Sequence, residues 1–130
     1  MIVVDSSAII EVLLHTKSAL RIEQRVFAPD ETLHAPHLID IEVAQVLRRY
    51  CASGELDSNR GREALEDLND FPITRYPHDI LLPRIWELRL NMTAYDATYV
   101  ALAEILFAPL LTLDIRLASA PGHSALIELV

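Results

Sequence analysis

The sequence predicts a three-layer α/β domain, in which helices cover both faces of a short, parallel central sheet. Short apolar runs alternate along the chain with longer segments whose apolar residues recur at helical spacing. Strands that are apolar at every position are typical of a parallel sheet buried on both faces. The chain has 130 residues, 52% of them hydrophobic, which suits one domain expected over residues 1–130.

The first half of the chain is expected to form two strands and three helices. In order, they are a strand over 1–4, helices over 8–14 and 18–27, a strand over 32–35, and a helix between Pro36 and Gly54. Ser6 or Ser7 is the expected N-cap of the first helix, because a serine hydroxyl accepts a bond from a free backbone amide. Pro29 ends the second helix and Gly54 ends the third.

The second half continues the alternation. Helices are expected over 58–68, 78–90 and 94–107, and strands over 72–76, 110–113 and 125–130. Thr93 is the expected cap of the helix that ends near Phe107. The strands are too short and too regularly separated by helices for any class other than α/β.

Four acidic residues fall where the expected strands end or the following helices begin. Asp5 and Asp114 follow strands, Glu42 lies in the first turns of a helix, and Asp96 lies near the start of another. In a parallel sheet these positions share one edge, where ligands bind. Each acid alone is also explained as a helix cap or a first-turn residue. Caps need no common location, however, so we expect the four carboxylates to meet in one pocket.

Such a pocket requires a positive charge. Two carboxylates ~4 Å apart repel by about 1 kcal/mol in water and by about 4 kcal/mol at an effective dielectric constant of 20. Lys17 is the only lysine, and an all-oxygen ligand set favours Mg²⁺ or Mn²⁺. His34 and His37 have a zinc-like spacing in HAPH, but Pro36 and the expected turn favour a surface or supporting role.

Four segments resemble the PIN-domain ribonucleases, specifically the VapC-type toxins of type II toxin–antitoxin systems. They are VVDSSAIIEVLL, HAPHLIDIEVAQVLRR, YDATYVALAE and LLTLDIRLA. The resemblance implies that Asp5, Glu42, Asp96 and Asp114 are catalytic residues that bind Mg²⁺ or Mn²⁺. It also implies that two hydroxyl residues, Ser7 and Thr112, support this site.

The same resemblance implies a function and partners. The expected activity is metal-dependent endoribonuclease cleavage of RNA phosphodiester bonds, which inhibits translation and growth when a VapB-like antitoxin is absent. A homodimer is also expected, with a contribution from the proline-containing helix over 78–90. Arg116 follows Asp114 closely, and we expect it to contact the RNA backbone or an acid.

Several other classes of protein fit this sequence poorly. Three glycines cannot build a glycine-rich phosphate loop. A phosphate-accepting receiver needs two adjacent acids after the first strand and a late lysine, and both are absent. A net charge of -8 argues against a surface that coats nucleic acid.

A single cysteine and the lack of a membrane or signal segment predict a cytoplasmic protein. The alternative left open is a catalytically silent PIN-like module that binds RNA or protein.

Overall fold

The computed structural model describes all residues 1–130 and contains one five-stranded sheet in the order β3-β2-β1-β4-β5. Every neighbouring pair of strands is parallel. The strands are β1 (Ile2–Val4), β2 (Leu33–Pro36), β3 (Ile73–Tyr76), β4 (Leu110–Thr112) and β5 (Ile127–Leu129). The predicted α/β class with a short parallel sheet is therefore confirmed.

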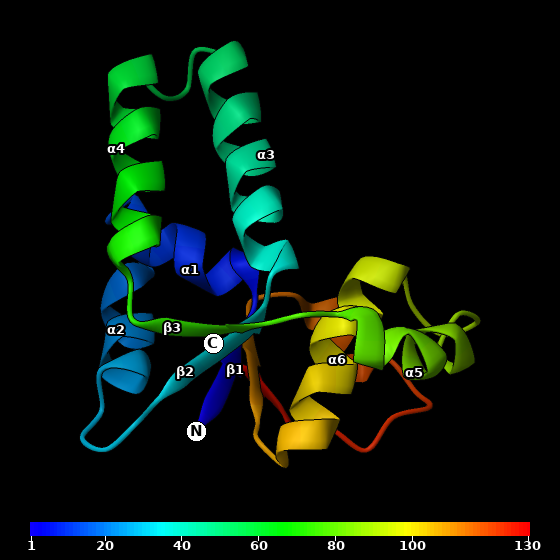
Figure 1. Cartoon of the computed structure of the whole chain (residues 1–130). Coiled ribbons are helices and arrows are strands. Elements are labelled where there is room, and N and C mark those ends of the chain that lie inside the picture. Colours follow the sequence, from blue (N-terminus) through cyan, green and yellow to red (C-terminus); the bar gives the residue numbers. More distant parts are fainter.

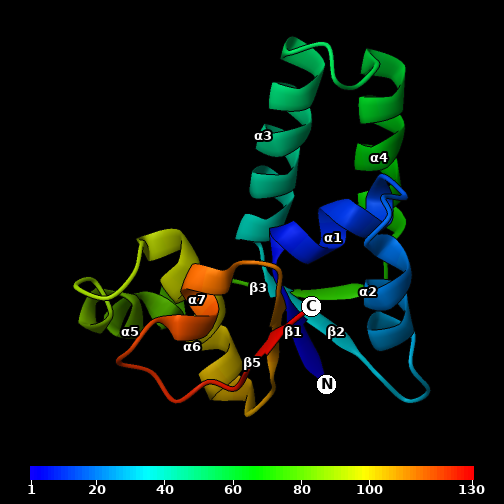
Figure 2. The same cartoon turned by 180° about the vertical axis from the view of Figure 1, so that it is seen from behind.

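Helices cover both faces of the sheet (Figure 1). They are α1 (Ser6–Leu13), α2 (Ala19–Val26), α3 (Leu38–Ala52), α4 (Ser58–Asp70), α5 (Leu82–Glu87), α6 (Ala94–Leu106) and α7 (Ile115–Ser119), with a 3₁₀ turn η1 (Asp79–Leu81). Helices α1 and α2 lie on one side of the sheet, and α5 and α6 lie on the other, as the reverse view also shows (Figure 2). The α3–α4 hairpin projects beyond the sheet.

The core explains the apolar patterns of the sequence. All three residues of β1 are fully buried, because this strand lies in the centre of the sheet with helices on both faces. The residues of α6 from Ala97 to Ala103 are buried on every side of the helix. Gly54 follows α3 with φ +81°, a conformation that glycine adopts without strain at the end of a helix. None of the helices has both the length and the apolar character that crossing a bilayer requires.

Two local predictions were wrong, and one helix was missed. Asp5, not Ser6 or Ser7, is the N-cap of α1: its backbone is extended and its Oδ1 accepts a bond from the Ala8 amide at 3.2 Å. The helix expected over 78–90 is divided into η1 and α5. Helix α7 was not predicted, because its five residues are too few to show a period.

His34 is a buried residue of β2 and not the surface or supporting residue that HAPH suggested. Its side chain is 6% exposed, its Nε2 lies 2.8 Å from the Thr32 hydroxyl, and its Nδ1 lies 2.7 Å from the Tyr76 hydroxyl. His37 stands at the start of α3 without a side-chain capping bond. Burial, followed by the positive N-terminus, lowers the pKa of His34 below the usual histidine value.

We expect His34 to make the stability of the protein depend on pH. Because its pKa is lowered in the folded state, the unfolded chain binds a proton more readily below pH ~6.5. The free energy of unfolding should therefore fall as pH decreases through that value and recover as pH rises. Chemical denaturation across this range should show a weaker pH dependence for His34→Gln than for the unaltered protein. His78→Gln, an exposed control, should keep it; parallel pH profiles for all three would contradict the assignment.

Candidate active site

The structure places Asp5, Glu42, Asp96 and Asp114 at one edge of the sheet. Asp5 directly follows β1 and Asp114 follows β4 after one residue, so both lie at the carboxyl ends of adjacent parallel strands. Glu42 lies in the second turn of α3, and Asp96 lies in the first turn of α6. The charges of these acids act on one another: Asp5 and Asp96 both raise the pKa of Glu42, and Asp114 raises that of Asp96.

Asp5 is held by three donors that approach from two segments of the chain. The Ser7 hydroxyl donates to its Oδ1 at 2.5 Å, the Ala8 amide donates to the same oxygen, and the Thr112 hydroxyl donates to Oδ2. Asp5 is 7% exposed and Thr112 is fully buried. A carboxylate with both oxygens bonded in this way keeps a single orientation.

The hydroxyls of Ser7 and Thr112 also link Asp5 to the end of β4. Ser7 accepts from the Leu113 amide at 3.1 Å, and Thr112 accepts from the Asp114 amide at 3.0 Å. The backbone that carries Asp114 is therefore bonded to the groups that orient Asp5. The supporting role of Ser7 and Thr112 in the site stays a prediction, and these bonds are the observation that favours it.

Replacing Thr112 tests this network. Thr112→Val keeps the shape but leaves Asp5 Oδ2 and the Asp114 amide without their partner. An unpaired buried polar group costs ~1–3 kcal/mol, so we expect the free energy of unfolding to fall by about that amount. Thr112→Ser, which retains the hydroxyl, should lose less. Chemical denaturation measures both, with the exposed Thr74→Val as control; equal stability of the two Thr112 variants would argue against the network.

Tyr99 is a site residue that was not predicted. Its hydroxyl donates to Glu42 Oε1 at 2.5 Å, although the ring is only 2% exposed. Burial raises the pKa of Tyr99, and the nearby charge of Glu42 raises it further, so the phenol remains a donor. Tyr99 follows Asp96 by one turn of α6, which means that a single helix supplies one acid and the group that orients another. The apolar pattern of α6 gave no sign of this bond.

Asp114 and Arg116 are joined by the start of α7. Asp114 is the N-cap of that helix and accepts from the Arg116 amide at 2.9 Å. The Arg116 guanidinium lies 3.6 Å from the same carboxylate, and its side chain is 92% exposed. Arg116 and Asp96 also line one shallow hollow. The arginine thus contacts an acid of the site and is open to solvent.

The electrostatics of the site show an excess of negative charge. Burial is the first cause of the raised pKa of Asp5, Glu42 and Asp96, and neighbouring carboxylates raise each value further. The only ion pair formed by the four acids joins Asp114 to Arg116. No three acidic, histidine or cysteine side chains are grouped closely enough to form a ready metal cage. The four possible ligands are all carboxylates, and three of them form no ion pair. Such a donor set nevertheless fits a hard divalent cation.

Comparisons with known proteins identify the family of this chain. The PIN domain model matches residues 2–122. Ribonuclease VapC9 of Mycobacterium tuberculosis is 47% identical over 118 residues, which cover 91% of this chain and 89% of the relative. Ribonuclease VapC1 of the same species is 45% identical over 129 residues, covering 98% and 96%. The crystal structure of VapBC2 from Rickettsia felis bound to a promoter DNA fragment superposes with a TM-score of 0.69 at 14% identity, covering 98% of both chains. This chain therefore belongs to the PIN-domain family and, within it, to the VapC ribonucleases.

Proposed function

We propose that this protein is an endoribonuclease that requires Mg²⁺ or Mn²⁺ and acts in the cytoplasm as the toxin of a toxin–antitoxin pair. Family membership supports ribonuclease activity. The observation that carries the metal requirement is the group of carboxylates at one sheet edge, three of which form no ion pair. Inhibition of growth would follow from RNA cleavage when no antitoxin is bound.

In this proposal, Asp5, Glu42, Asp96 and Asp114 hold the cation. A divalent ion bound there would offset negative charge on the scissile phosphate and lower the pKa of water. Ser7 and Thr112 keep Asp5 in one orientation, and Tyr99 does the same for Glu42. Since three of the acids have raised pKa values, the cation also favours their ionised forms.

Arg116 is the proposed contact to the RNA backbone beside these acids. Its guanidinium is exposed next to Asp114 and can exchange that weak contact for a phosphate oxygen. If Arg116→Ala left RNA affinity and cleavage unchanged, this result would exclude Arg116 as a contact to the RNA backbone.

Two protein partners are part of the proposal. The Rickettsia felis neighbour is a VapBC complex, which supports a VapB-like antitoxin as the partner of this chain. For a homodimer, the support is a set of exposed apolar side chains on η1, α5 and the turn that follows: Ile80, Leu82, Trp86 and Leu90. Apolar surface of this kind marks interaction sites. Light scattering of the purified protein and of its Trp86→Ala variant tests the homodimer.

The function is tested by incubating the purified chain with structured and unstructured RNA. We expect cleavage with Mg²⁺ or Mn²⁺ and none with EDTA, and we expect Asp5→Asn to abolish it. Mapping the product ends across total RNA would identify the substrate. Cleavage that persists in Asp5→Asn or in EDTA would contradict the proposal. RNA binding without cleavage under any ion would instead support the catalytically silent module.

A further inference from the structure

A groove between α1 and α3 begins at the candidate active site. Two adjoining hollows of about 360 and 250 Å³ share Ser6, Val46 and Arg49 as lining residues. Glu42 lines the first hollow, and Ser7, which bonds to Asp5, lines the second. The groove is therefore continuous with the carboxylate edge.

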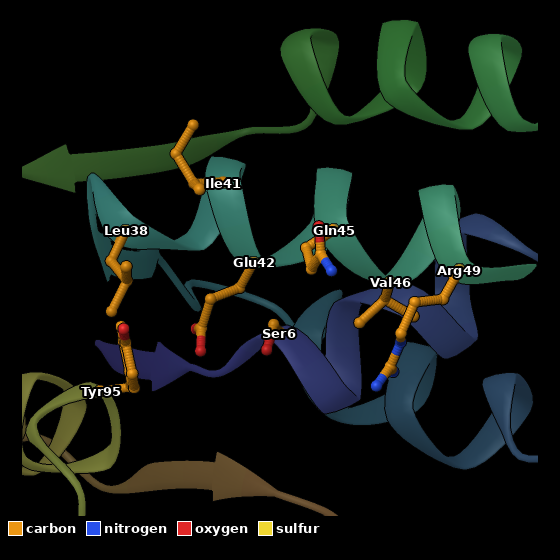
Figure 3. Close-up of a pocket in the computed structure, with 8 residues that line it drawn as sticks. All are labelled: Ser6, Leu38, Ile41, Glu42, Gln45, Val46, Arg49 and Tyr95. Carbon is orange, nitrogen blue, oxygen red and sulfur yellow. The ribbon is translucent and has the colours of Figure 1, made fainter.

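An exposed aromatic ring and a cation flank Glu42 in this groove. Figure 3 shows Tyr95 facing Leu38 at one end, Glu42 and Ser6 between the helices, and Arg49 extending toward α1 at the other end. Tyr95 is 61% exposed and immediately precedes Asp96. Arg49 follows Glu42 by seven helical residues, a rise of ~10 Å.

Arg49 is the one arginine that both lines this groove and forms no ion pair with a carboxylate. Of the ten arginines, six form ion pairs with carboxylates: Arg25, Arg60, Arg62, Arg75, Arg84 and Arg116. The remaining four are Arg21, Arg48, Arg49 and Arg89, and of these only Arg49 lines the groove. In a chain of net charge -8, an unpaired guanidinium here provides a specific contact for an anion.

We propose that this groove binds single-stranded RNA on the two sides of the bond to be cleaved. Tyr95 stacks on a base next to the scissile phosphate, and Arg49 binds a phosphate farther along the strand. The inference rests on the proposed ribonuclease function and adds a position for the substrate. Stacking on an exposed aromatic ring and a single phosphate contact tolerate different base sequences. Because Tyr95 adjoins Asp96, a base stacked on this ring places its own backbone near the acids.

Binding is measured with the Asp96→Asn protein, so that a short, labelled single-stranded RNA of mixed sequence stays intact. Fluorescence anisotropy over a series of salt concentrations gives the affinity and its salt dependence. Adding Arg49→Ala should weaken binding several-fold and reduce the slope of log affinity against log salt by about 0.7, the value for one phosphate contact on a single strand. Adding Tyr95→Ala should weaken binding about ten-fold, while Tyr95→Phe should retain it.

Matched controls separate this groove from general surface charge and exposed aromatic area. Arg48→Ala removes the neighbouring exposed arginine of α3, and Phe107→Ala removes an exposed ring just after α6; neither should change the affinity or the salt slope appreciably. Equal effects of Arg48→Ala and Arg49→Ala, or unchanged binding by Tyr95→Ala, would overturn the inference. If Arg49→Ala or Tyr95→Ala lost a copurified protein partner while RNA binding stayed unchanged, the groove would be a site for protein, and the inference would also be overturned.

The ribonuclease function is judged separately, in the protein with Asp96 intact. If that protein cleaves RNA with Mg²⁺ while the Arg49 and Tyr95 changes leave binding unaltered, the groove inference fails and the function stands. If the groove variants weaken binding as expected but no cleavage occurs, the groove is supported and the function fails.

Discussion

Asp96→Asn is expected to reduce RNA cleavage on the order of 10³-fold while leaving the protein folded. The substitution keeps the size of the side chain but removes one negative charge from the edge that the acids share. A divalent cation contributes several kcal/mol to transition-state stabilisation, and each 1.36 kcal/mol corresponds to a ten-fold change in rate. Asp96 does not cap α6, since Thr93 supplies the capping oxygen, so the helix should be unaffected.

Initial rates with saturating Mg²⁺ measure this effect. Asp70→Asn is the matched control, because Asp70 is an exposed carboxylate at the end of α4, and its rate should equal that of the unaltered protein. Circular dichroism verifies that both variants are folded. A rate within ten-fold of the unaltered protein would show that Asp96 is not required to hold the cation.

The main features of this fold could be predicted from the sequence because they depend on local patterns. The run IVV and the two leucines of LLT are apolar without alternation, which is typical of a strand covered on both faces. Once the strands are known, the position of Asp5 and Asp114 at one edge follows from parallel pairing alone. The predicted N-cap of α1 was wrong because Asp5 has two roles. Its carboxylate belongs to the site and also accepts a bond from the Ala8 amide.

Features that depend on how helices pack were not predictable in this way. The bond from Tyr99 to Glu42 joins α6 to α3 across 57 positions of sequence, and no local period encodes that distance. His34 was expected in a surface or supporting role because Pro36 and a turn were expected to follow it; its bond to Tyr76 forms only when β2 pairs with β3. The groove between α1 and α3 likewise arises from helix packing.

Divalent metal is expected to raise the thermal stability of the protein, and this effect should depend on the same acids. Without a cation, burial and mutual repulsion raise the pKa of Asp5, Glu42 and Asp96, which shows that their ionised forms are unfavourable in the fold. A ligand at a hundred times its Kd stabilises the folded state by ~2.7 kcal/mol. For a chain of 130 residues, this corresponds to an increase in Tm of about 10 °C.

Differential scanning calorimetry with Mn²⁺ and with EDTA measures this increase without any assay of activity. Asp96→Asn should be more stable than the unaltered protein in EDTA, because one repelling charge is gone, and should gain little from Mn²⁺. Asp70→Asn should respond to Mn²⁺ as the unaltered protein does. This pattern distinguishes a metal site from general stabilisation, because Asp96→Asn should have the higher Tm in EDTA but the smaller increase in Tm with Mn²⁺. A cation that acted on the whole acidic surface would raise the Tm of all three proteins equally. An equal increase in Tm with Mn²⁺ for all three proteins would therefore exclude the carboxylate edge as the metal site, even if RNA cleavage required a metal.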